Sequence, residues 1–78
     1  MTNIEKYNQV FCDNFSISEE KLNDLTYQSI QLWDSVGHMN LIAALEDEFD
    51  IMLETEDIVD FSGYKKGLEI LKNNGIEF

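Results

Sequence analysis

Residues 33–49 read WDSVGHMNLIAALEDEF, and this run carries the strongest helical signal in the chain. Asp34 or Ser35 suits the N-cap position, since either side chain can accept a hydrogen bond from a free N–H of the first turn. At 100° per residue, the large apolar side chains that follow gather on one side of a helix: Leu41, Ile42, Leu45 and Phe49. The run therefore predicts a helix over about residues 35–50 with one face in a core.

Three further helices are predicted from the same helical period. The first covers about residues 3–15 and has an apolar stripe made of Ile4, Tyr7, Phe11 and Phe15. A short helix is expected at 55–61, capped by Thr55, with two inward side chains, Ile58 and Phe61. The last is expected at 62–74, capped by Ser62 and ended near Gly75, with a stripe of Tyr64, Leu68 and Leu71.

Residues 16–33 have weaker periodicity and are predicted to form a loop with room for a short helical turn at 19–24. Five side chains are expected to hold this loop on the core: Leu22, Leu25, Tyr27, Ile30 and Leu32. No segment alternates as a strand does. The predicted fold class is all-α, a four-helix bundle with a short third helix.

Composition bounds the partners of this chain. Its 78 residues suit a single domain over 1–78, and a hydrophobic fraction of 44% is too high for a disordered acidic tail. Sixteen acidic residues against five basic ones give a net charge of −11. Such a field repels nucleic acid and anionic membranes and attracts basic protein surfaces, so docking onto basic partners is expected.

The sequence also bears on location and metal binding. No apolar run approaches the ~18–20 residues of a membrane span, and the first residues lack the basic start and apolar stretch of a signal peptide. A cytoplasmic location is therefore expected. The protein is also expected to be a monomer. Cys12 is the single cysteine, which excludes an internal disulfide and gives no support to a zinc site, so no metal is expected.

Ser35 is the residue with the most chemical promise. At a helix start, free N–H groups and the helix dipole favour a phosphate, and the side chain faces an approaching enzyme. A plain N-cap serine would also explain the position. The face opposite the core adds a second feature, because it is part apolar and part acidic and is expected to lie in solvent: Val36, Asn40, Ala43 and Asp47. This stripe is a candidate surface for docking partner proteins.

Asp34-Ser35-Val36 resembles the Asp-Ser-Leu signature of acyl carrier proteins, and residues 33–49 resemble the second helix of that family almost throughout. The resemblance implies a four-helix carrier bundle in which a phosphopantetheinyl transferase attaches 4′-phosphopantetheine from coenzyme A to Ser35. The thiol of that arm would carry an acyl group as a thioester and present it to acyl-loading and acyl-using enzymes with basic docking patches. Carrying over the family's partner-docking positions gives Asp34, Val36, Glu46 and Asp47, with Ala43 and Ile58 for apolar contact.

The chain departs from the family pattern near the serine. Val36 replaces the usual leucine, His38 is not the usual residue, and Gly37 and Asn40 stand where members of fatty acid synthesis commonly have acids. Trp33 and the Gly37-His38 pair resemble stand-alone carriers that serve specialised pathways, such as surface polysaccharide or secondary metabolite assembly, and fatty acid, polyketide and other cargoes stay open.

Two other classes of function compete with the carrier hypothesis. A hydrolase that uses Ser35, His38 and Asp34 lacks a nucleophile-elbow motif and has too short a chain for a pocket, so no catalytic residue is expected. A calcium loop beginning at Asp47 would place Phe49 at a ligand position and Met52 where a glycine is needed. The alternative that remains is an acidic helical interaction module, an inhibitor or adaptor, without a prosthetic group.

Overall fold

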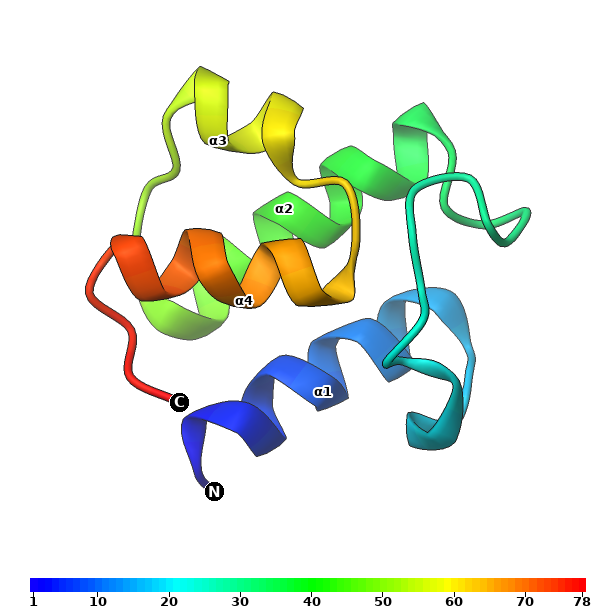
Figure 1. The fold of residues 1–78 in the computed structure, drawn as a ribbon, viewed down its shortest axis with the longest axis horizontal. Coiled ribbons are helices and arrows are strands. Elements are labelled where there is room, and N and C mark those ends of the chain that lie inside the picture. The colour runs from blue at the N-terminus through cyan, green and yellow to red at the C-terminus, as the bar shows by residue number, and fades with distance from the viewer.

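Four α-helices and one short 3-10 turn make up the computed structural model, which describes residues 1–78. The helices are α1 (Asn3–Phe15), α2 (Ser35–Phe49), α3 (Thr55–Asp60) and α4 (Tyr64–Asn73), and the turn covers Glu19–Lys21 (Figure 1). The structure has no strand, only a single isolated bridge between Thr26 and Gly63. The prediction of an all-α bundle with a short third helix is confirmed.

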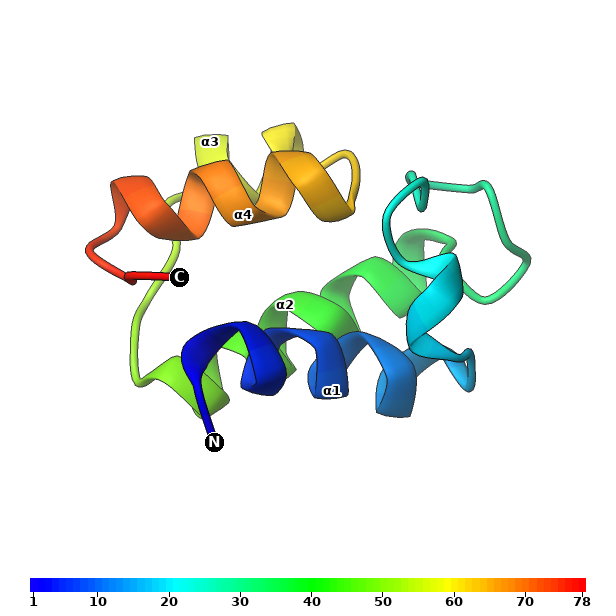
Figure 2. The ribbon, with the colours of Figure 1, turned by 60° about the horizontal axis from the view of Figure 1, so that its bottom comes forward.

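The helices lie in two layers. Figure 2 shows α1 beside α2 in one layer and α4 beside α3 in the other. The two chain ends meet at one side of the bundle, where the Asn3 side-chain amide donates to the Glu77 carbonyl at 2.9 Å. None of the four helices is both long enough and apolar enough to cross a membrane.

The bounds of α1 follow from its caps. Thr2 accepts from the Glu5 N–H while the Glu5 carboxylate accepts from the Thr2 N–H, which together form a capping box. The hydrogen bonds from Thr2 lower the pKa of Glu5. The helix stops at Phe15 because Ser16 adopts a left-handed conformation with φ of 55°. The predicted bounds of 3–15 are confirmed, although the capping box was not anticipated.

The predicted caps of the two later helices are wrong. The N-caps are Glu54 and Gly63, and neither makes a side-chain capping bond. The helix expected from residue 62 begins only at Tyr64 because the chain before it pairs with the long loop. The Ser62 carbonyl accepts from the Tyr27 N–H at 2.8 Å, and the Tyr64 N–H donates to the Leu25 carbonyl at 2.9 Å.

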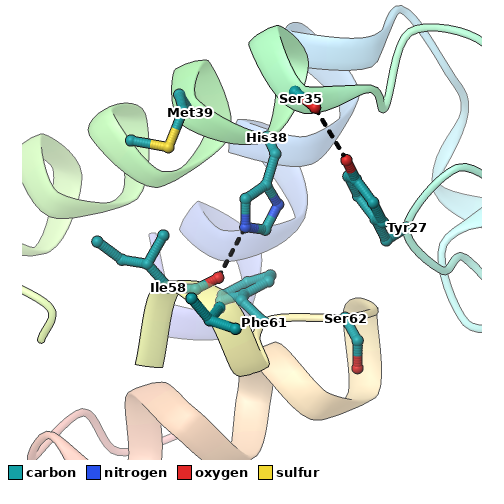
Figure 3. Close-up of a pocket in the computed structure, with 8 residues that line it drawn as sticks. Tyr27, Ser35, His38, Met39, Ile58, Phe61 and Ser62 are labelled. Atoms are coloured by element: carbon teal, nitrogen blue, oxygen red, sulfur yellow. Dashed lines mark hydrogen bonds between the residues drawn. The ribbon is translucent and has the colours of Figure 1, made fainter. Parts of the chain in front are cut away.

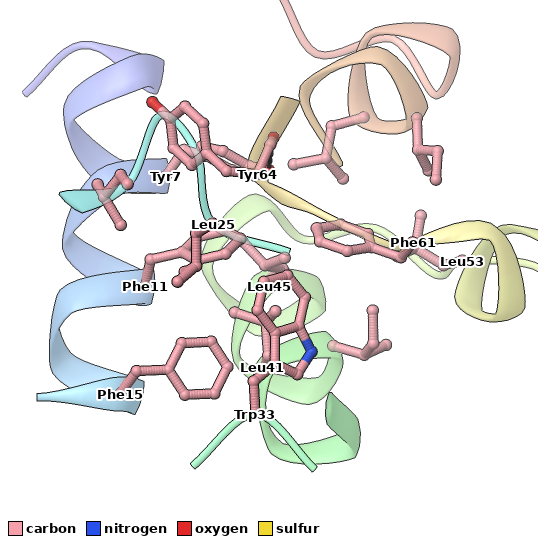
Figure 4. Close-up of a cluster of buried hydrophobic side chains, with 14 residues drawn as sticks. Tyr7, Phe11, Phe15, Leu25, Trp33, Leu41, Leu45, Leu53, Phe61 and Tyr64 are labelled. Atoms are coloured by element: carbon pink, nitrogen blue, oxygen red, sulfur yellow. Dashed lines mark hydrogen bonds between the residues drawn. The ribbon is translucent and has the colours of Figure 1, made fainter. Parts of the chain in front are cut away.

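Aromatic side chains fill the centre of the bundle (Figure 4). Tyr7, Phe11 and Phe15 of α1 are buried, as their spacing predicted. Trp33 is 0% exposed and packs on Phe15 at a ring-centroid distance of 5.2 Å and on Phe11 at 5.7 Å. The expectation that Leu32 anchors the loop is wrong: its side chain is 54% exposed, because Trp33 takes the inward position at this point of the chain.

Candidate functional site

Ser35 is the first residue of α2, and its side chain is exposed. The cap itself is Asp34, whose Oδ1 accepts from the Gly37 N–H at 2.8 Å. The backbone N–H groups of Ser35 and Val36 have no acceptor within the chain. An exposed hydroxyl therefore stands beside two free donors at the positive end of a 15-residue helix, a setting that favours a phosphate ester.

A groove of about 370 Å³ opens beside Ser35. Its lining is mainly apolar and comes from the long loop, α2 and the region of α3: Tyr27, Ser35, His38, Met39, Ile58, Val59, Phe61 and Ser62. Figure 3 shows Ser35 and Tyr27 on one side of the groove, Met39 and Ile58 on the other, and His38 between them. The modification candidate and the largest apolar groove of the molecule are thus one site.

Tyr27 was predicted to hold the loop on the core, but its side chain lines this groove and is 37% exposed. Its hydroxyl lies 3.2 Å from Ser35 Oγ, so that either group can donate the hydrogen bond between them. Its ring meets the His38 ring edge to face at 5.4 Å. Tyr27 therefore orients the serine hydroxyl from outside the helix. Helical periodicity cannot predict this contact, because the chain between the two residues is irregular.

His38 is fully engaged in hydrogen bonds. Its Nδ1 lies 3.0 Å from Trp33 Nε1, which can only donate, so Nδ1 accepts and carries no proton. Its Nε2 lies 2.8 Å from the Ile58 carbonyl, which can only accept, so Nε2 carries the proton. With both nitrogens occupied, the imidazole has no lone pair for Ser35, and the serine–histidine pair that a hydrolase requires does not form.

The predicted docking stripe faces solvent along α2. Val36 is 70% exposed, and Asn40, Ala43 and Asp47 are also exposed. Ile58 is half-buried and forms part of the groove lining. These positions have the accessibility that contact with a partner requires, and their role in docking stays a prediction.

Two of the carboxylates predicted to dock partners also accept hydrogen bonds that stabilise the fold. Asp34 caps α2, as described above, and Glu46 is half-buried. The Glu46 Oε2 accepts from the Leu53 N–H at 2.9 Å and so holds the connection between α2 and α3. The Glu46 carboxylate is therefore less free to contact a partner than that of the exposed Asp47.

Charge is unevenly distributed along the chain. Nine of the sixteen acids lie between residues 34 and 60, and no lysine lies between 22 and 64. The single ion pair joins Lys66 and Glu69 at 3.9 Å, on α4. The half of the molecule around α2 and α3 is consequently an uncompensated anionic surface, yet no three acidic, histidine or cysteine side chains converge as a metal site would need.

Added salt should raise the thermal midpoint of unfolding by several degrees. The molecule measures 29 × 28 × 19 Å, so its charges repel across the whole fold at about 0.01 M salt, where the screening length is about 30 Å. At about 0.15 M that length falls to about 8 Å, which leaves only neighbouring charges in repulsion. Melts followed by circular dichroism would check this, and magnesium chloride at matched ionic strength should act alike. An unchanged or lowered midpoint would contradict it.

The lone cysteine lies away from this site. Cys12 is a free, half-buried thiol on α1. Burial raises its pKa, and the carboxylates of Glu19 and Asp13 raise it further. A thiol with a raised pKa is a poor nucleophile at neutral pH, so Cys12 behaves as a small packing residue.

Comparison with known proteins bears on identity. The chain is 29% identical, over 79 aligned positions, to an acyl carrier protein of Buchnera aphidicola subsp. Acyrthosiphon pisum (strain 5A). It is 28% identical to the acyl carrier proteins of strains Tuc7 and APS of the same subspecies. Each alignment covers 99% of this chain and 99% of the relative. No family model and no solved structure matched the chain. Similarity along the whole length, together with the four-helix fold, agrees with the family that the Asp34-Ser35-Val36 motif indicated: the chain is similar to the acyl carrier proteins from end to end.

Proposed function

We propose that the protein carries acyl groups as thioesters on a 4′-phosphopantetheine arm attached to Ser35. The observation that carries the proposal is the exposed Ser35 hydroxyl at the N-terminus of α2, next to an apolar groove. The name shared by the curated relatives, acyl carrier protein, supports the same role. When bound, the arm supplies a terminal thiol on which an acyl group is held and passed on.

The residues around Ser35 fit a phosphodiester. In the attachment, a bond forms between Ser35 Oγ and the phosphorus nearest the pantetheine of coenzyme A, and the phosphoanhydride bond to the nucleotide breaks. The nucleotide leaves as adenosine 3′,5′-bisphosphate. The free N–H groups of Ser35 and Val36 can then donate to the phosphate, as can the Tyr27 hydroxyl. Because His38 is occupied, the serine proton goes to a base in the transferase.

Partner enzymes would dock on the anionic surface around α2 and α3. Val36 and Ala43 offer exposed apolar contact, while Asp47 offers a free carboxylate on the same face. Such a surface suits a basic patch on the phosphopantetheinyl transferase and on the enzymes that load and use the acyl group. The core draws buried side chains from α1, α2, α4 and the connecting segments, which supports treating residues 1–78 as one domain.

Intact mass measurement tests the proposal. After incubation with coenzyme A and a phosphopantetheinyl transferase, the protein should gain the mass of one phosphopantetheine, and fragmentation should locate it on Ser35. In a parallel incubation of unmodified protein, the transferase with acetyl-coenzyme A in place of coenzyme A should give a gain that is larger by one acetyl group. A chain whose mass stays unchanged with an active transferase, or that is modified at another residue, would overturn the proposal. The interaction module without a prosthetic group would then be the better explanation.

A further inference from the structure

The groove beside Ser35 ends at the surface of the core. Fourteen side chains form the core, and Phe61 alone among them also lines the groove. Phe61 is 1% exposed, and its ring lies 6.3 Å from that of Phe11 and 6.5 Å from that of Trp33. Behind the groove wall, the space that would lead inward is already taken by aromatic rings in contact with one another.

The route between α2 and α3 is also closed by hydrogen bonds. His38 of α2 donates to the Ile58 carbonyl of α3 at 2.8 Å and accepts from Trp33 at 3.0 Å. The Asn74 side-chain amide, at the end of α4, donates to Asp57 of α3 at 3.2 Å and so holds α3 from its other neighbour. A chain that passed between α2 and α3 would break the bonds of His38 and leave partly buried polar atoms without their partners, which is unfavourable.

We infer that the cargo of this carrier is a short acyl group that stays in the surface groove, and that the bundle interior does not take up a long alkyl chain. The inference rests on the proposed function and narrows its substrate class. The groove volume of about 370 Å³ is at the low end of the about 300–1,000 Å³ found for small-molecule sites. Any methylenes beyond the groove would lie in water, which disfavours a long apolar cargo.

The test compares two cargoes on one protein. The transferase is supplied with acetyl- or dodecanoyl-coenzyme A, and intact mass confirms that each form carries one complete arm. Trp33 is the only tryptophan, buried and bonded to His38, so its fluorescence reports entry into the interior. We expect the same Trp33 emission maximum and the same thermal midpoint for both forms. A dodecanoyl form that melts several degrees above the acetyl form, with a shifted Trp33 emission, would overturn the inference.

Variants that open the interior serve as the positive control. Phe61→Ala removes the ring that closes the groove, and His38→Ala removes the bridge between α2 and α3 with a smaller loss of packing. In whichever variant remains folded, the dodecanoyl form should melt several degrees above the acetyl form. Equal midpoints in a folded Phe61→Ala protein would mean that Phe61 does not exclude the chain, and would count against the inference.

A second experiment, which needs no transferase, separates this inference from the proposed function. In a Cys12→Ser background, Ser35→Cys can be alkylated with two-carbon or twelve-carbon iodoacetamides. Equal midpoints for the two adducts would support the closed interior even if the transferase left Ser35 unmodified. An unmodified Ser35 would contradict the proposed function but not this inference. A higher midpoint for the twelve-carbon adduct would overturn the inference whether or not Ser35 is the natural attachment site.

Discussion

Ser35→Ala should abolish the mass gain with coenzyme A and transferase completely, while the protein stays folded. The loss is total because the hydroxyl oxygen is the atom that forms the bond to phosphorus, and alanine has none. The fold should survive because the cap of α2 is Asp34 and not Ser35. Ser35 is exposed, and substitutions at such positions usually change the free energy of unfolding by about 0.5 kcal/mol or less.

Ser62→Ala is the matched control for this loss. Ser62 is also an exposed serine and lines the same groove, but it lies before α4 and not at the start of α2. It should be loaded at the wild-type rate. Circular dichroism melts of both variants would show whether folding is kept, and a Ser35→Ala protein that still gained one arm would place the attachment site elsewhere.

Trp33→Ala should lower the free energy of unfolding by about 3–5 kcal/mol, the usual cost of truncating a buried aromatic side chain. Trp33 is 0% exposed and contacts rings from α1, the long loop and the end of α3. The substitution also leaves His38 Nδ1 without its donor. Domains of ordinary stability have only about 5–15 kcal/mol in total, so the variant should lose a large share of its stability and unfold at a clearly lower urea concentration.

Trp33→Phe separates packing from hydrogen bonding. Phenylalanine keeps an aromatic ring in the core but cannot donate to His38, so a smaller loss of about 1–3 kcal/mol is expected from the unpaired nitrogen. Urea denaturation followed by circular dichroism would measure both variants, since neither has a tryptophan to report by fluorescence. A Trp33→Ala protein within about 1 kcal/mol of the wild type would show that the ring cluster is not a main source of stability.

Local periodicity predicted the bounds of α1 and α2, whose N-termini are capped by neighbouring side chains. It gave the wrong start for α4, where segments distant in the sequence pair. The stripes of α1 and α2 gave bounds within one residue of those observed. Ser62 looked like a cap because serine commonly caps helices, yet its backbone pairs with Tyr27, 35 residues earlier, and delays α4. The sequence did not predict that Trp33 points inward and Leu32 outward. A loop has no regular repeat from which the directions of its side chains can be worked out.

In the candidate site, too, the positions along α2 were predictable and the contacts between separate elements were not. Helix phase alone placed Val36, Asn40, Ala43 and Asp47 in solvent, and all four are exposed. The contacts of Tyr27 with Ser35 and of His38 with Ile58 depend on how a loop and a second helix pack against α2. The sequence suggests one chemical role for His38, that of a base for Ser35, because spacing shows what a side chain is near on its own helix but not what it bonds across the fold.

The absence of lysine between residues 22 and 64 has a practical use in surface-based measurements. Amine-reactive linkers can attach only at the chain start or at Lys6, Lys21, Lys65, Lys66 and Lys72. Protein immobilised on a sensor through its amines would thus be tethered by α1, the 3-10 turn or α4. Ser35 and the anionic surface around α2 and α3 would carry no label and stay open to an enzyme in the flow.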